Sequence, residues 1–268
     1  MPMLYNLEQI IRSVRLKIPL ANVGSLGSTD DDIRVMINEA CWENLIPGMM
    51  KLQEEYFTLR ERLAIDARGA VRIPHRALFQ KLRYVYLYGT SGRSRIHPIQ
   101  KEHLDGGGFG AASYYIEGND VILHPEPPNG FDTLEVHYFF RPGELVLSTE
   151  CRQIIDVDYT TKIVTFDAGI PADWNIDLLF DIHSGQSGAE INLFDASSPD
   201  MNDVNVTFTE ALDGSLFGTR PVLVGDWVCL AETAALPGLP RELHPQVARA
   251  AALTWRRRRM DRRGSRRW

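Results

Sequence analysis

The segment LPGLPRELHP, residues 236–245, separates an extended part of the chain from a helix near the C-terminus. Pro237 and Pro240 fix their own φ angles and disfavour helix in the residues before them. The next ten residues, QVARAAALTW at 246–255, are rich in good helix formers. Four of their side chains fall at helical spacing: Val247, Ala250, Ala251 and Thr254. The pattern predicts a C-terminal helix.

This helix leads into RRRRMDRRGSRRW, residues 256–268, which contains eight arginines and one aspartate. The whole chain has a formal charge of −6, so removing this tract's +7 leaves −13 for residues 1–255. An acidic body repels nucleic acid, so we expect binding of DNA only through the tract. The tract has three possible roles: a solvated appendage, a nucleic-acid-binding segment, or a segment that docks on an acidic protein surface.

Docking on a protein is the role that we favour, because guanidinium groups pair with carboxylates in a bidentate manner and tryptophan fills apolar pockets. The residues expected to make this contact are Trp255, Arg256, Arg257, Arg258, Arg259, Arg262, Arg263, Arg266, Arg267 and Trp268.

Composition places the chain among ordinary globular proteins, with 44% apolar and 24% charged residues in 268. Its three cysteines, Cys41, Cys151 and Cys229, form no CxxC pair, which is typical of reduced thiols rather than a disulfide framework or zinc site. No apolar run approaches the roughly 20 residues of a membrane span. We expect a protein made in a cytoplasm, with no membrane association.

Helices are expected at both ends of the chain. Asn6 is positioned to cap a first helix with an apolar stripe from Leu7 to Val14, and STDDD at 28–32 precedes a second. Residues 49–57 could extend the helical region beyond the break at Pro47, and residues 75–80 fit a short helical turn. Two polar segments, 184–192 and 196–203, are expected to be loops.

Short strands with frequent turn residues predict an antiparallel sandwich or barrel in the middle of the chain. The expected strands are 59–65, 71–73, 84–88, 114–117, 121–124, 133–140, 153–158, 162–166, 176–182, 204–209 and 222–230. The predicted fold is α+β: a helical region from both termini with an inserted antiparallel β-domain. Its expected parts are residues 1–100, helical with a few strands; 101–236, the β-domain; and 237–268, the C-terminal helix and tract.

Catalytic motifs are not found, and we expect no enzyme, cofactor or metal site. The glycine-rich segments at 89–94 and 106–110 lack the spacing of a phosphate loop. Asp156 and Asp158 could share a cation with Asp181, but Asp-x-Asp before a turn usually caps a hairpin. Trp174 is the one candidate platform for a carbohydrate, and burial in a core is the expectation for it.

Three parts of the chain resemble head-to-tail adaptor (connector) proteins of tailed bacteriophages, especially short-tailed phages. The first is the opening helix followed by STDDDI (28–33) and NEA (38–40). The second is YIEGNDVILHP (115–125) leading to YFFRPGELV (138–146). The third is GDWVCL (225–230) followed by LPRELHP (239–245), the most distinctive of the three. Together they span most of the chain in the family's order.

The resemblance implies a structural part of the virion, assembled in the host cytoplasm. Adaptors of this family form a ring, usually of twelve copies, beneath the portal at one capsid vertex. They continue the DNA channel, which DNA passes without specific binding, and they offer a platform for a tail or nozzle protein. A C-terminal segment commonly embraces the portal, a role that would fall to residues 246–268 here. The large β-domain and the arginine-rich end depart from the compact helical adaptors. The alternative function is nucleic-acid binding through the arginine tract.

Overall fold

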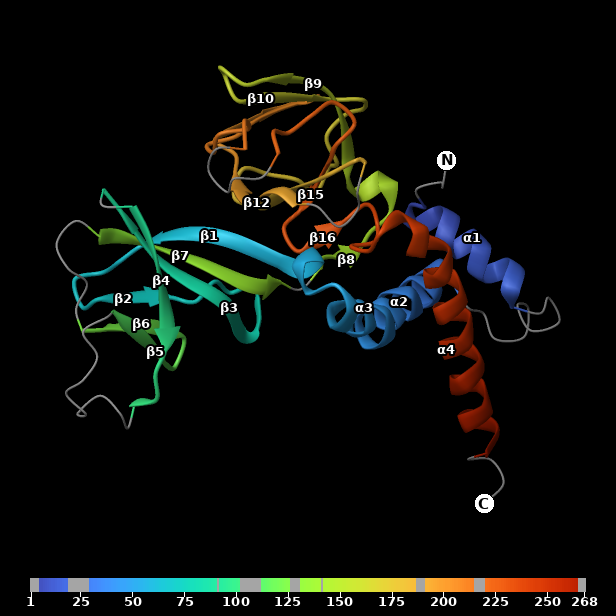
Figure 1. The fold of residues 1–268 in the computed structure, drawn as a ribbon. Helices are drawn as coiled ribbons and strands as arrows, with labels where there is room; N and C mark the ends of the chain where they lie inside the picture. The colour runs from blue at the N-terminus through green and yellow to red at the C-terminus, as the bar shows by residue number, and fades with distance from the viewer. Residues whose placement is uncertain are drawn as a thin grey trace. The chain divides into compact units, whose positions relative to one another are not determined.

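The structure is a computed structural model. It describes residues 5–18, 29–90, 92–101, 112–125, 131–140, 142–186, 191–214 and 220–264, with side chains as far as Arg258. The chain forms two compact units, coloured along the sequence in Figure 1. The first unit combines Met1–Tyr56 with Pro142–Trp268, and the second is Phe57–Arg141.

This division differs from the predicted boundaries after residues 100 and 236. The boundary at 100 falls inside one unit, because strands before and after it belong to the same sheet. A single sheet cannot be cut without breaking its ladder of backbone hydrogen bonds. The chain therefore contains two β-rich parts, one on each side of residue 141, where the sequence predicted one.

The first unit contains helices from both ends of the chain. Their bounds are α1 Leu7–Lys17, α2 Asp30–Ala40, η2 Cys41–Leu45, α3 Ile46–Leu52, η3 Glu54–Phe57 at the junction with the second unit, η5 Ser148–Glu150, η6 Arg241–Leu243 and α4 His244–Gly264. Helix α4 contacts both α1 and α2. Since the chain also forms two mainly antiparallel seven-stranded sheets, one in each unit, the fold class is α+β, as predicted.

The N-terminal helices begin where capping residues predicted. The Asn6 side chain accepts a hydrogen bond from the Gln9 amide at 3.0 Å, and the Gln9 side chain accepts one from the Asn6 amide at 3.2 Å. At α2, the Thr29 hydroxyl accepts a hydrogen bond from the Asp32 amide at 3.2 Å. Each cap satisfies amides that have no partner inside the helix. The predicted stripe of α1 is buried: Leu7, Ile10, Ile11 and Val14.

A π-turn, η2, separates α2 from α3 just before Pro47. In this turn the Ile46 amide bonds to the Cys41 carbonyl five residues earlier. Proline has no amide hydrogen and its ring clashes with the carbonyl four residues before it, so a wider turn accommodates it. The chain thus stays helical through Pro47, which occupies the first turn of α3.

The sheet of the first unit has the strand order β12-β11-β15-β9-β10-β14-β13, with antiparallel neighbours throughout. Its strands are β9 Arg152–Asp158, β10 Ile163–Phe166, β11 Leu179–His183, β12 Ile191–Ser197, β13 Asp200–Asn202, β14 Asn205–Thr207 and β15 Trp227–Leu230. The two edge strands, β12 and β13, follow each other in the chain. Thr209, just after β14, donates its amide hydrogen to the carbonyl of Ser197 at the end of β12, at 3.1 Å. The sheet is therefore nearly closed and barrel-like.

Aromatic rings fill the interior of this sheet. Trp174 lies 5.0 Å from Phe180 and 5.9 Å from Phe166, measured between ring centroids, and Phe180 contacts Phe208 at 6.3 Å. All four rings are buried. A small parallel pair, β8 Glu144–Leu145 with β16 Thr233–Ala234, lies outside the barrel-like sheet and contacts α2 through β8.

The sheet of the second unit has the order β1-β7-β3-β4-β5-β6-β2. Its strands are β1 Thr58–Ala64, β2 Ala70–Arg72, β3 Ala77–Gly89, β4 Gly92–Pro98, β5 Ser113–Glu117, β6 Asp120–His124 and β7 Phe131–Phe140. Neighbours are antiparallel except β4 and β5. The predicted hairpin at residues 114–124 is confirmed, with Gly118 in the left-handed region that its turn requires.

Several local predictions are corrected by the structure. The expected loop at 196–203 contains the end of β12 and all of β13, and the expected helical turn at 75–80 is the irregular start of β3, with Phe79 and Gln80 at positive φ. Strands β1 and β2 do not form the predicted pair but bind β7 and β6. No helix among the described residues has the length and apolar character needed to cross a membrane.

Candidate partner-binding site on helix α4

Helix α4 begins at a buried histidine. His244 is fully buried; its Nδ1 accepts a hydrogen bond from the Tyr5 amide at 3.2 Å, and its Nε2 donates to the Leu239 carbonyl at 3.1 Å. This pair of contacts requires the neutral ring with its proton on Nε2. Burial lowers the pKa of His244, although the hydrogen bond to Leu239 raises it in part. The start of the helix is thereby tied to the N-terminal end of the chain.

One face of α4 is buried within the first unit. The buried side chains recur at helical spacing and are Val247, Ala248, Ala251, Ala252 and Trp255. The alanines allow close approach to α1 and α2, which both contact α4. The predicted helix and the burial of Val247 and Ala251 are confirmed, while Ala250 and Thr254 are only half-buried. The N-terminal half of α4 is therefore anchored by its own chain.

The arginine tract continues the same helix instead of leaving it as a separate tail. Helix α4 runs to Gly264, and in Figure 1 its C-terminal half extends past α1 and α2. Arg256, Arg257 and Arg258 are exposed. Cations near a helix C-terminus interact favourably with the helix dipole, which helps an Arg-rich sequence stay helical.

Two of these exposed arginines touch the chain itself. Arg258 forms an ion pair with Glu39 of α2, and Arg256 donates to the Lys17 carbonyl at the end of α1 at 3.4 Å. Both contacts lie at the solvent-exposed edge of the helical region, where single ion pairs contribute little to stability. Arg256 and Arg258 therefore remain exposed despite these contacts.

The structure changes the predicted role of Trp255. Its side chain is only 9% exposed and belongs to the buried face of α4, so it anchors the helix within the chain and is not presented to a partner. Helical spacing explains this, because Trp255 lies one turn beyond Ala251 on the same face. The side chains of Arg259, Arg262 and Arg263, and the whole of Arg266, Arg267 and Trp268, lie outside the described residues.

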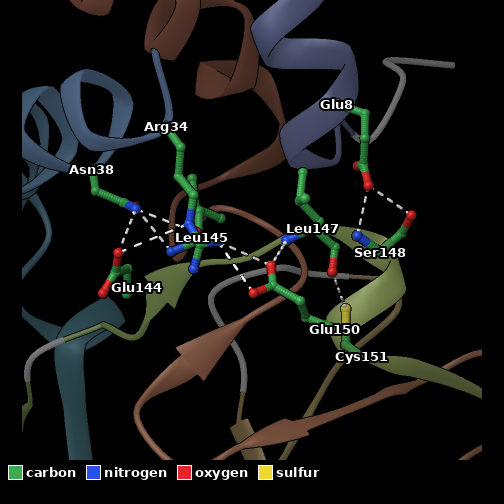
Figure 2. A network of polar contacts seen from close by, with 9 residues as sticks. All are labelled: Glu8, Arg34, Asn38, Glu144, Leu145, Leu147, Ser148, Glu150 and Cys151. Atoms are coloured by element: carbon green, nitrogen blue, oxygen red, sulfur yellow. Dashed lines mark hydrogen bonds and ion pairs between the residues drawn. The ribbon is translucent and has the colours of Figure 1, made fainter. Parts of the chain in front are cut away.

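A polar network fastens α1 and α2 to the segment that enters the barrel-like sheet (Figure 2). Arg34 of α2 contacts both carboxylate oxygens of Glu150 at 3.1 Å. Asn38 accepts a hydrogen bond from the Leu145 amide at 2.9 Å and donates to the Leu145 carbonyl at 3.2 Å. Glu8 of α1 accepts hydrogen bonds from the Ser148 amide and hydroxyl at 2.6 and 2.7 Å.

This network holds the helices against which α4 packs, and no local sequence pattern predicts it. Arg34 and Glu150 are separated by 116 positions, so no local spacing links them. Asn38 is 4% exposed and is the one polar side chain among the buried residues of α2; its place directly after Met36 and Ile37 was the available signal. A buried amide needs polar partners, and here they are the Leu145 amide and carbonyl and the Glu144 carboxylate, which accepts a hydrogen bond from Asn38 at 3.2 Å.

The three aspartates considered as a cation site have different environments. Asp181 is buried and accepts hydrogen bonds from the Asp195 and Glu232 amides, whereas Asp156 is exposed and Asp158 caps the turn at residues 159–161. No group of three or more potential metal ligands occurs among the described residues. Trp174 is in the core, as expected, and burial raises the pKa of Cys41 to about 12. The glycine-rich segment at 106–110 lies outside the described residues.

No protein-family model matches this chain, and no curated protein matches it.

Proposed function

We propose that this protein is a structural component of a tailed-bacteriophage virion that forms a ring adaptor between the portal and the tail. In this proposal the ring contains about twelve copies, as the resemblance to the adaptor family implies, and continues the DNA channel without binding DNA specifically. A tail or nozzle protein meets the opposite end of the ring. The protein acts by holding partners in place, not by catalysis.

The observation that carries the proposal is the arginine-rich end of α4, which continues a helix anchored along its N-terminal half. An anchored helix presents its guanidinium groups at lower conformational cost than a flexible tail, so more of the contact energy appears as affinity. Exposed Arg256, Arg257 and Arg258 are chemically suited to carboxylates on a portal surface. Arginine is also the residue type best suited to such interface pairs.

The charge of the rest of the chain supports the same function. Residues 1–255 carry −13, and a wall of negative charge lets a DNA duplex pass without adhering to it. The second candidate, a nucleic-acid-binding protein that uses the arginine tract, would have to overcome this repulsion. Its binding would fall steeply as salt increases.

Electron microscopy of the protein mixed with its cognate portal tests the proposal. The comparison is between the full chain and a chain that stops after Trp255, which keeps the buried face of α4 intact. Portal-bound rings should form with the full chain and be lost with the shortened one. A chain in which the arginines from 256 onward are replaced by lysines keeps the charge and should bind the portal more weakly, because lysine lacks the bidentate fork.

The result that contradicts the proposal is equally specific. If the full chain leaves the portal bare but retards duplex DNA in a gel, with affinity falling steeply between 50 and 200 mM salt, the nucleic-acid function replaces the adaptor function. In that case the lysine-substituted chain should bind DNA nearly as well as the original. Phosphate binding depends mainly on charge, so this control separates the two functions.

A further inference from the structure

One outer face of the second unit carries arginines stacked on tyrosines. Along β3, Val85 and Leu87 are buried, whereas Tyr84, Tyr86 and Tyr88 alternate with them on the opposite face. Strands β7 and β4 flank β3 in the sheet, and β1 lies beyond β7 (Figure 1). We name this outer face the arginine–tyrosine face and define it by Arg62, Arg93, Arg95, Tyr84, Tyr86 and Tyr88.

Each arginine of this face covers a tyrosine ring. The guanidinium carbon of Arg93 lies 3.7 Å from the Tyr86 ring centroid, that of Arg62 4.1 Å from Tyr88, and that of Arg95 4.5 Å from Tyr84. Such cation–π contacts hold a guanidinium group with its plane over the ring and its edges available for hydrogen bonds. The face therefore presents ordered positive charges.

A buried carboxylate fixes two of these arginines. Glu135 of β7 is 1% exposed and contacts Arg93 at 2.7 Å, Arg62 at 3.0 Å and His137 at 3.0 Å. Burial raises the pKa of Glu135, but the hydrogen bonds from His137 and Arg62 and the charge of Arg93 outweigh it and leave the pKa below its ordinary value. Two arginines, Arg62 and Arg93, contact this one carboxylate, so the group keeps a net charge of +1. The exposed Arg95 adds a further positive charge to the face.

Charge is divided unevenly between the two units. The second unit has 11 lysines and arginines against 9 aspartates and glutamates, a net charge of +2, which leaves −8 for the first unit. Residues 256–268 belong to the first unit and carry +7, so the rest of that unit carries −15. The outer face of β9 and β13 is one acidic surface of this unit, with exposed Asp156, Asp158 and Asp200.

The pairing of these strands places the three aspartates on one face. Asp158 pairs with Ile163 of β10, Ile163 with Thr207 of β14, and Thr207 with Asp200 of β13. Asp156 lies in the adjacent outward row opposite Thr165, while Val157 and Val164 turn inward toward the core. We name this surface the aspartate face, defined by Asp156, Asp158 and Asp200. It is opposite in charge to the arginine–tyrosine face.

We propose that the arginine–tyrosine face binds the aspartate face of a neighbouring copy of this chain. The inference rests on the proposed function, because it names the contact that joins copies within the ring. A ring requires a head-to-tail contact between two different surfaces, and the chain supplies two surfaces of opposite charge on separate units. Single-stranded nucleic acid is a poorer fit, since it stacks bases on open aromatic rings and these rings are covered by guanidinium groups.

A charge-reversal experiment tests this contact. The variant R95E reverses a charge that is stacked on Tyr84 but not bonded to Glu135, so the sheet should stay folded. We expect its assembly, measured by mass photometry of the protein alone and on portal, to need at least about tenfold more protein, because like charges at an interface repel. The matched control R72E changes the same charge on β2, away from the face, and should assemble normally.

Restoration by a second reversal identifies the partner surface. R95E combined with D156R and D200R should recover assembly, whereas D156R with D200R alone should lose it. The proposal is overturned if R95E assembles like the original chain or if the combined variant fails to recover. It is also overturned if rings persist in R95E while binding of a fluorescent oligonucleotide is lost, which would make nucleic acid the occupant. Rings that form in solution but never on portal would refute the adaptor function and leave this contact standing.

Discussion

The barrel-like sheet of the first unit and strand β3 of the second unit place their aromatic side chains differently. In the first unit, Trp174, Phe166 and Phe180 form the interior of the barrel-like sheet. In the second unit, Tyr84, Tyr86 and Tyr88 lie on the outer face, beneath arginines. The second unit also buries aromatic side chains, those of Tyr138, Phe139 and Phe140 in β7. Whether an aromatic side chain in β3 is buried therefore depends on the face of the strand to which it points.

The largest effect is expected from removing an interior ring. Trp174→Ala should lower the free energy of unfolding of the first unit by about 3–5 kcal/mol, because it deletes a buried indole that touches two other rings. Chemical denaturation followed by tryptophan fluorescence measures this, since all five tryptophans lie outside residues 57–141. Tyr84→Ala on the outer face of the second unit is the comparison and should cost much less. Because that unit contains no tryptophan, its loss is measured by hydrogen exchange read by mass spectrometry. Equal losses of unfolding free energy in Trp174→Ala and Tyr84→Ala would mean that both side chains belong to a hydrophobic core.

Each unit also contains a buried carboxylate bound to arginine, and the two carboxylates should contribute differently to stability. Asp226 accepts hydrogen bonds from the Gly185 and Leu223 amides, from Asn192, and from Arg220 at 2.6 Å. Glu135 contacts only side chains. Asp226→Asn should therefore destabilise by about 2–3 kcal/mol and Glu135→Gln by about 1–2 kcal/mol. Hydrogen exchange read by mass spectrometry assigns each loss to its unit, and the reverse order would contradict the comparison.

Acid should weaken the two units in different pH ranges. Folding lowers the pKa of His244 below 6.5, so its contribution to the first unit is present above pH 6.5 and lost as pH falls below it. Folding also lowers the pKa of Glu135 below 4.5, so its contribution to the second unit is lost only in more acidic solution. Hydrogen exchange between pH 7 and 4 should show protection falling first at the start of α4. His244→Gln should remove that first step.

The smallest effect is expected at the caps of the N-terminal helices. Thr29→Ala removes the hydroxyl that accepts the Asp32 amide and should cost about 1 kcal/mol in the first unit. The second unit should be unaffected, because α2 belongs to the first. Thr29→Ser keeps the hydroxyl and serves as control. A matching loss of protection in the second unit would show that the units do not unfold independently.

Local patterns predicted much of the fold. The stripe of α1, the cap at Asn6 and the hairpin around Gly118 depend on residues a few positions apart, and each is present in the structure. The predicted stripe of α4 is buried only at Val247 and Ala251. The site on α4 was predicted only in part. The arginines at 256–258 are exposed, but the periodicity that predicted the helix also places Trp255 on its buried side.

Sequence patterns predict the starts of α1, α2 and α4, the buried stripe of α1 and the distribution of charge along the chain. The pairing of β1 with β7, the separate unit at residues 57–141 and the contacts of Arg62 and Arg93 with Glu135 are seen only in the folded structure. Caps and helical stripes are satisfied by neighbours in sequence, whereas sheet partners and buried ion pairs depend on which distant strands the whole fold brings together.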